Sequence, residues 1–152
     1  MLIAFLFLFM ITVKIVETEN EFNEAIKLRY ELLRLPLNLP EGSEVDELET
    51  SAVTIIALKK EQIIGTGRIH SVDEKTMQIR FMAVRKDFQN KRIGAKILVA
   101  LEQIALLKKV SEIILNARNE IKHFYIKNGY TVIGEPFESV GICHVSMSKI
   151  LK

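Results

Sequence analysis

Residues 77–98, MQIRFMAVRKDFQNKRIGAKIL, decide the fold, because an apolar strand there runs through a basic loop into an apolar helix. A helix N-terminus presents unpaired N–H groups and the positive end of the helix dipole, which together attract anions. Lys91 and Arg92 add full positive charges, and Gly94 permits close approach of a ligand to the backbone. The segment predicts an anion site suited to a diphosphate. A solvated basic turn that contains a glycine by chance is the alternative.

The rest of the chain alternates between strands and helices around that segment. Apolar runs with β-branched residues or period-two alternation predict strands, and apolar positions at helical spacing predict helices. Thr18 is expected to cap the first helix, and Pro36 and Pro40 to end it. The expected strands are 11–18, 51–60, 63–72, 76–84, 111–117, 130–135 and 141–151, and the expected helices are 18–35, 91–109 and 119–128, with 41–49 a loop or a short helix.

Glycines and a proline add detail to this order. Gly65 and Gly67 mark a bulge or a close backbone approach. Gly129 is expected at positive φ where a helix ends, and Pro136 in the loop between the last two strands. The order of elements predicts an α/β protein, a three-layer α-β-α sandwich around a mixed, mostly antiparallel sheet.

Composition narrows the class of protein. A chain of 152 residues with 49% apolar and 26% charged residues suits one folded domain and is wrong for a disordered chain. A net charge of +2 gives no basis for a nucleic-acid partner. Cys143 is the single cysteine, which excludes an intramolecular disulfide and favours a cytoplasmic protein; it is expected in a strand core. The three histidines are scattered, so no metal site is expected.

The N-terminal run MLIAFLFLFMITV, residues 1–13, is apolar apart from one threonine. As a helix it would span roughly 20 Å against about 30 Å for a hydrocarbon core, and it lacks the positive flank of a secretory signal. We therefore expect residues 1–9 to be an appendage and residues 10–152 to be one domain, with no stable membrane insertion. A partial membrane anchor is the alternative, which equal solubility of the full chain and of a chain starting at Met10 would exclude.

A second segment, ILNARNEIKHFYIKNGY at residues 114–130, points to a family. Together with the loop QNKRIGA at residues 89–95, it resembles the GCN5-related N-acetyltransferase (GNAT) family. That family has the loop Q/R-x-x-G-x-G/A between a strand and a helix. Further along it has a helix with F-Y-x-x-x-G-F/Y, which stands here as FYIKNGY at residues 124–130. The two motifs have the family's order and separation.

The resemblance covers residues 11–151 and has one departure, Arg92 at the first glycine of the loop. Residues 28–49 and 141–151 are further similar to a bacterial subgroup of small, uncharacterised acetyltransferases. The resemblance implies the acyl-CoA N-acyltransferase fold, in which two central strands splay apart.

The resemblance also implies that acetyl-CoA binds in the cleft between those strands. The backbone of residues 81–84 would pair with the pantetheine arm, and loop N–H groups would hold the pyrophosphate. Asn119 would border the path of the pantetheine and adenosine, or else cap the following helix. The expected cofactor-binding residues are Phe81, Met82, Ala83, Val84, Gln89, Asn90, Lys91, Arg92, Ile93, Gly94, Ala95, Asn119 and Tyr125.

The family motif makes Tyr125 the expected general acid, because a phenol near the thioester can protonate the departing thiolate. The alternative is a tyrosine packed between helix and sheet. The general base is open: some family members use a glutamate where this chain has Gln78, which cannot serve. His144 titrates in the right range but could equally be a core residue of an apolar strand. The acidic residues Glu44, Asp46 and Glu47 are the other candidates for the base, and proton loss through a chain of waters needs no dedicated base.

The acceptor is expected to be a primary amine of a small molecule or of a peptide. In the family the first helix borders the acceptor pocket, so Arg29 and Arg34 either bind a substrate carboxylate or face water. The acidic stretch is either a clamp for a cationic amine or a solvated turn. The expected acceptor-binding residues are Arg29, Tyr30, Arg34, Glu44 and Asp46, with Glu47 beside them. We expect the acetyl group to be transferred directly to this amine, and we expect a homodimer. A non-catalytic acyl-CoA-binding or sensing module is the alternative function.

Overall fold

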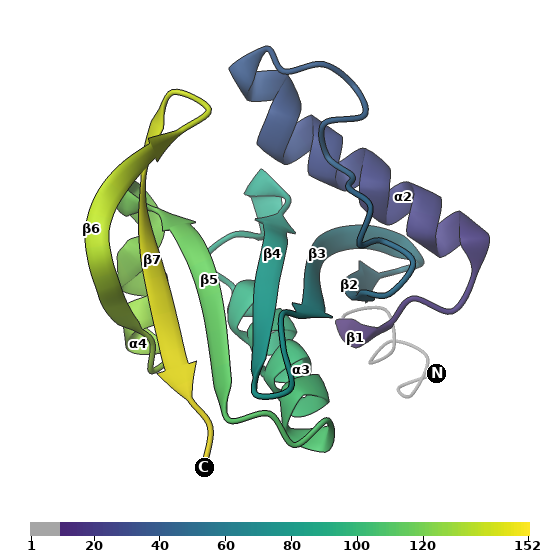
Figure 1. The fold of residues 1–152 in the computed structure, drawn as a ribbon. Helices are drawn as coiled ribbons and strands as arrows, with labels where there is room; N and C mark the ends of the chain where they lie inside the picture. Colours follow the sequence, from purple (N-terminus) through teal and green to yellow (C-terminus); the bar gives the residue numbers. More distant parts are fainter. Residues whose placement is uncertain (1–9) are drawn as a thin grey trace.

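The protein is a seven-stranded sheet between two helical layers, as seen in a computed structural model that describes residues 10–152 (Figure 1). The expected appendage at residues 1–9 lies outside the described residues. The strands are β1 (Thr12–Ile15), β2 (Val53–Lys59), β3 (Gln62–Ser71), β4 (Thr76–Val84), β5 (Glu112–Arg118), β6 (Thr131–Ser139) and β7 (Ile142–Ile150). Their order in the sheet is β1-β2-β3-β4-β5-β7-β6, and only β4 and β5 are parallel neighbours.

The helices cover both faces of the sheet, which confirms the predicted three-layer sandwich. In Figure 1, α2 (Glu19–Arg29) crosses one face, while α3 (Ile93–Leu107) and α4 (Lys122–Lys127) lie behind the sheet on the other. Four short helical turns flank these helices: a π-helical turn, η1 (Tyr30–Arg34), and three 3-10 turns, η2 (Leu35–Leu37), η3 (Lys86–Phe88) and η4 (Asn119–Ile121). Within residues 10–152, every helix is too short or too polar to cross a membrane.

Helix α2 begins at a capping box, as Thr18 predicted. The Thr18 hydroxyl accepts a hydrogen bond from the Glu21 N–H at 3.1 Å, and the Glu21 carboxylate accepts one from the Thr18 N–H at 3.3 Å. Ala25 and Leu28 then pack on the sheet in a small core. The helix ends earlier than expected, because a wide turn replaces the α-helix from Tyr30 to Arg34. Residues 41–49 form turns, not a short helix.

Helix α3 packs on β3 at two glycines, which confirms the predicted close approach. A Cβ atom added to Gly65 would lie 2.8 Å from Ile97 Cδ1, and one added to Gly67 would lie 2.9 Å from Leu101 Cδ1. Both glycines also lie next to register shifts of β3 against its neighbours. The main hydrophobic core therefore forms between α3 and the sheet.

Two expectations about the last hairpin are wrong. Pro136 lies within β6, at a shift in register between Ile133 and Phe137, and not in the loop. Proline has no N–H to donate to a neighbouring strand. The sheet tolerates it in β6 because β6 is an edge strand, whose outer side has no neighbour to receive a hydrogen bond. Cys143 is exposed near the tip of the β6–β7 hairpin and is not a core residue.

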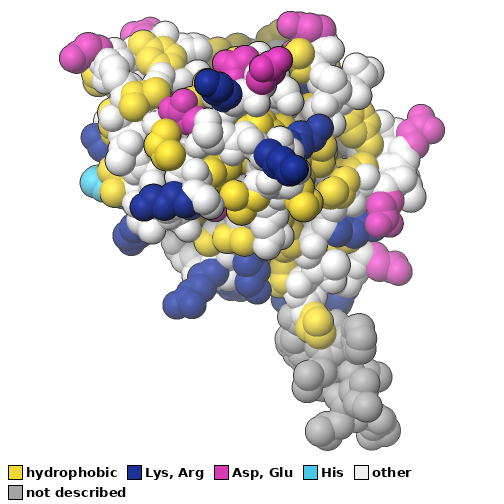
Figure 2. Space-filling view, turned by 60° about the horizontal axis from the view of Figure 1, so that its bottom comes forward, with side chains coloured by type: hydrophobic (Ala, Val, Ile, Leu, Met, Phe, Trp, Pro, Cys, Tyr) yellow, Lys and Arg dark blue, Asp and Glu magenta, His cyan; other side chains and the backbone are white. Residues whose placement is uncertain are grey.

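The surface carries charges of both signs. The face in Figure 2 shows Lys and Arg side chains as well as Asp and Glu, with apolar side chains between them. This mixture is what the small net charge predicts.

Candidate active site

Strands β4 and β5 part in the middle of the sheet. They pair from Thr76 with Glu112 to Ile79 with Leu115, and not beyond. Each strand continues with its other neighbour instead, β4 with β3 as far as Val84, and β5 with β7 as far as Arg118. The predicted splay is thereby confirmed, and it opens one edge of each strand into a cleft of about 1330 Å³.

A bulge bends β4 at the mouth of this cleft. Phe81 and Met82 together oppose Gly67 of β3, and Phe81 has φ +56°. A non-glycine residue in this region costs roughly 1–2 kcal/mol, so its surroundings must hold it there. Four guanidinium groups surround the Phe81 ring at 4.8–5.4 Å from its centroid and stabilise it by cation–π interactions: those of Arg29, Arg34, Arg68 and Arg80.

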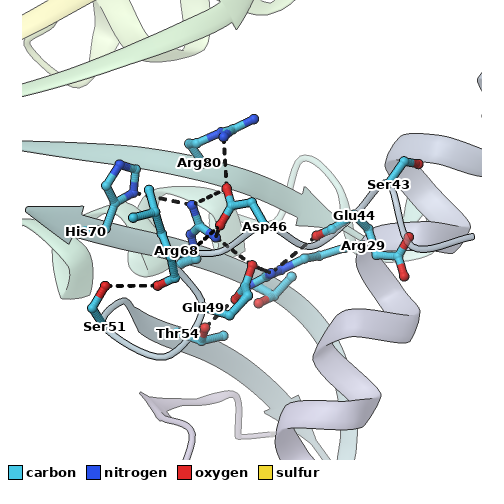
Figure 3. Close-up of polar contacts among 12 residues, drawn as sticks. Arg29, Ser43, Glu44, Asp46, Glu49, Ser51, Thr54, Arg68, His70 and Arg80 are labelled. Carbon is cyan, nitrogen blue, oxygen red and sulfur yellow. Dashed lines mark hydrogen bonds and ion pairs between the residues drawn. The ribbon is translucent and has the colours of Figure 1, made fainter. Parts of the chain in front are cut away.

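A buried network of arginines and carboxylates fixes loop 41–51 to the sheet (Figure 3). Arg68 of β3 donates to Asp46 at 2.7 Å and also to Glu49. Arg29 of α2 donates to Glu49 at 2.8 Å, and Arg80 of β4 donates to Asp46 at 3.0 Å. Arg29 and Arg68 are fully buried.

This network corrects the expectations for Arg29 and Asp46 as acceptor-binding residues. Arg29 neither faces water nor lines the cleft, and an acceptor would have to displace Glu49 and Thr54 to reach it. Asp46 belongs to no solvated turn, because Arg68 and Arg80 both bind it. A carboxylate held by two guanidinium groups is a poor clamp for a cationic amine.

Asp46 should make stability depend on pH in the acid range. The hydrogen bond from Arg68 is the main reason that the pKa of the Asp46 carboxyl falls to about 2. A carboxyl whose folded pKa lies below its unfolded value stabilises the fold above the unfolded value, near 4. That contribution, up to about 2 kcal/mol, is lost as pH falls from about 4 through 2. Chemical denaturation at pH 6 and pH 3 should therefore show a smaller acid loss in Asp46→Asn than in the wild type, and equal losses would contradict this.

The other expected acceptor-binding residues are placed differently. Arg34 lines the cleft, and its guanidinium donates to the carbonyls of Ser43 and Leu33 at 3.0 and 3.2 Å. Glu44 is buried and accepts from the Gly42 N–H at 2.8 Å. Tyr30 is half-buried, and neither it nor Glu44 lines the cleft.

The basic loop bends through two left-handed residues before α3. Asn90 and Arg92 have φ near +60°, and Arg92 occupies the N-cap position, where its side chain accepts no hydrogen bond from the helix N–H groups. Arg92 thus takes a left-handed conformation that glycine adopts without strain, so an arginine at the motif's first glycine is compatible with this turn. Gln89 donates to the Val84 carbonyl at 3.1 Å and ties the loop to the end of β4. The exposed helix N-terminus is suited to an anion.

Arg92→Gly should raise the free energy of unfolding by up to about 1 kcal/mol, because glycine adopts the left-handed region without strain. It should also weaken acetyl-CoA binding, since a positive charge is lost. Lys91→Gly is the matched control: it removes a charge from the same loop but has no positive φ to relieve. Thermal denaturation and titration of both variants test this, and a loss of stability in Arg92→Gly would contradict it.

The two sequence motifs meet at the start of α3. A Cβ atom added to Gly94 would lie 3.2 Å from Phe124 Cζ of α4. Gly94 therefore makes room for the aromatic ring of the second motif. Gly129 closes α4 at φ +93°, as predicted.

Tyr125 and His144 both line the cleft. Tyr125 is buried, its ring meets the edges of Phe124 and Tyr130, and burial raises the pKa of its hydroxyl well above the usual range. His144 is half-buried and stacks on Phe137 at 5.7 Å. Its Nδ1 lies 2.8 Å from the Ile142 carbonyl, which can only accept. Nδ1 therefore carries the proton, and Nε2 of the neutral ring is left to accept one.

Asn119 lies elsewhere than expected. It is exposed at the first position of η4, outside the residues that line the cleft, and the N-caps of η4 and α4 are Arg118 and Ile121. The cleft contains instead Asn116, whose side chain accepts from Ser146 at 2.9 Å, together with Arg80 and Arg118. Strand alternation could have found these three, because each lies directly next to a core residue that points to the opposite face.

Comparison with known proteins agrees with this geometry. A model of the acetyltransferase (GNAT) domain family matches residues 41–151. YjcF of Bacillus subtilis strain 168, an uncharacterised N-acetyltransferase, is 32% identical over 136 residues, which are 89% of this chain and 96% of the relative. Escherichia coli ElaA has a TM-score of 0.81 at 17% identity, covering 92% of this chain and 99% of its own. A GNAT acetyltransferase from Elizabethkingia anophelis with acetyl-CoA bound has a TM-score of 0.68 at 18% identity, covering 93% and 98%.

Proposed function

The chain belongs to the GNAT acetyltransferase family, and we propose that it transfers an acetyl group from acetyl-CoA directly to a primary amine of a small molecule or of a peptide. The observation that carries this proposal is the cleft between β4 and β5, with the basic turn and the uncapped N-terminus of α3 at its border. A cytoplasmic location and a homodimer stay predictions.

The chain's residues fit the parts of acetyl-CoA. The open edge of β4 at residues 81–84 offers backbone groups to an extended pantetheine arm, as a sheet edge does to a peptide. Backbone N–H groups of residues 90–95 receive the pyrophosphate, and the charges of Lys91 and Arg92 reinforce them. Bound acetyl-CoA supplies the activated thioester carbonyl that the amine attacks.

Two residues of the cleft move protons. His144 Nε2 takes the proton that the acceptor ammonium must lose before it can attack, either directly or through a water. Tyr125 stays protonated because its pKa is raised, and it donates its O–H to the sulfur as that atom leaves. A raised pKa also makes the hydroxyl a weaker acid, so its hydrogen bond to the sulfur strengthens as negative charge builds up there.

The experiment is amine-dependent release of CoA from acetyl-CoA, with the acetylated product identified by mass. Amine-dependent release above spontaneous hydrolysis supports the proposal. A protein that binds acetyl-CoA but acetylates no member of a broad amine and peptide panel would contradict it and favour an acyl-CoA-binding module.

A further inference from the structure

The face of the sheet that α2 covers is polar where β4, β5 and β7 approach the cleft. Ile79, Ala117 and Val145 enter the main core under α3 and α4. Because side chains alternate along a strand, their neighbours point to the opposite face. Those neighbours are Gln78 and Arg80 on β4, Asn116 and Arg118 on β5, and His144 and Ser146 on β7.

Arginines dominate the charge of this cleft. Among residues 10–152, the charged side chains that line it are those of Glu120, Arg34, Arg80, Arg92, Arg118 and Lys127, so a single acidic side chain faces five basic ones. Arg92 belongs to the pyrophosphate loop and Lys127 to α4. Arg34, Arg80 and Arg118 are left, and all three lie outside the loop that we propose for the pyrophosphate.

These three arginines line the same cleft. The guanidinium groups of Arg34 and Arg80 lie 5.4 and 4.8 Å from the same ring, that of Phe81. Burial, and after it the positive charges of Arg80 and Arg118, lower the pKa of the Arg34 guanidinium. Three cations have thus been gathered against their mutual repulsion.

The neighbouring carboxylates do not neutralise them. Asp46 binds Arg80 but is shared with the buried Arg68. Glu49 binds Arg29 and Arg68. The charge of Glu44 favours the charged form of Arg34, but the Glu44 carboxylate accepts its hydrogen bond from the Gly42 N–H. In the described part of the chain, Arg118 forms no ion pair. Positive charge is therefore in excess where an acceptor would approach from the α2 side.

We propose that the acceptor amine carries a carboxylate, which Arg34, Arg80 and Arg118 bind, and that polycationic amines are poor substrates. This inference rests on the proposed acetyltransferase function. Planar guanidinium forks match a carboxylate in geometry and charge. The same positive field favours the neutral form of the acceptor amine, which is the form that attacks.

The test compares α- and ω-amino acids with their own carboxamides at saturating acetyl-CoA. At least one acid should exceed its carboxamide by about 10–100-fold in kcat/KM, the range expected from a hydrogen-bonded charge pair. An α-amine becomes less basic when its carboxylate is amidated, so amine ionisation biases these pairs against the expected result. Arg118→Gln should remove most of the preference. Lys108→Gln, which removes an exposed cation at the far end of α3, should leave it unchanged.

Calorimetry separates the two ways of failing. Wild type and Arg118→Gln should bind acetyl-CoA equally well, and the best acid should bind the CoA-saturated wild type but not the variant. Absence of acetyl-CoA binding by the wild type would remove the proposed function itself. Three outcomes together with normal acetyl-CoA binding would overturn the carboxylate proposal alone. They are a preference for carboxamides or polyamines, no binding of any acid, and an unchanged preference for the acid in Arg118→Gln.

Discussion

Phe in place of Tyr125 is expected to lower kcat by about 100-fold or more while acetyl-CoA affinity is retained. The ring is buried among Phe124 and Tyr130, so the variant keeps the packing and loses only the O–H. Without that donor, negative charge on the departing sulfur has to be stabilised by water alone. The loss should therefore fall on the chemical step and not on binding.

Tyr130→Phe is the matched control for this prediction. Tyr130 is another buried tyrosine of the same motif, but its hydroxyl bonds to Glu102 at 3.2 Å and does not line the cleft. Its loss should leave kcat nearly unchanged. If Tyr125→Phe kept wild-type turnover in a rate measured under conditions where chemistry is limiting, the assignment of Tyr125 as general acid would be wrong.

Arg68→Met is expected to lower the free energy of unfolding by about 3–5 kcal/mol. Arg68 is fully buried and holds Asp46 and Glu49, whose side chains are themselves only 17% and 12% exposed. Removing the guanidinium leaves both carboxylates largely buried with one fewer positive partner each. A buried charge without its partner is far more costly than a broken surface pair.

Arg80→Gln is the control, because Arg80 binds the same Asp46 but its side chain is 43% exposed. Its loss should cost about 1 kcal/mol or less. Urea denaturation of the two variants gives the comparison. Equal effects would mean that burial of Arg68 does not determine the strength of the network.

The fold could be predicted from the sequence because the residues that start and end its elements lie close together in the chain. Thr18 with Glu21 three residues later defines a helix start wherever the chain lies, and Gly129 reports a left-handed helix end. The loop at 89–95 and the helix motif at 124–130 fixed the family, and with it the splay that no local pattern predicts. Arg92 shows the limit of motif matching, since a backbone angle and not a residue type is what the turn needs.

The acceptor side could not be predicted in the same way, because its contacts join residues far apart in the chain. An arginine on α2 has the same sequence pattern whether it faces water or is buried against Glu49, twenty residues away. The acidic stretch likewise has the same sequence pattern whether it is a clamp for an amine, a solvated turn or, as in the structure, a partner of Arg68 and Arg80. Pro136 was misplaced because proline marks loops in most contexts, and only the sheet order reveals β6 as an edge strand.

Titration of acetyl-CoA into the protein by calorimetry tests the central claim most directly. The account predicts saturable binding that weakens by at least 10-fold in the double variant Lys91→Ala/Arg92→Ala, because two charges at the pyrophosphate are removed. The same double variant should keep a wild-type circular-dichroism spectrum, since both side chains are exposed. No binding at millimolar acetyl-CoA by a folded wild-type protein would contradict the account.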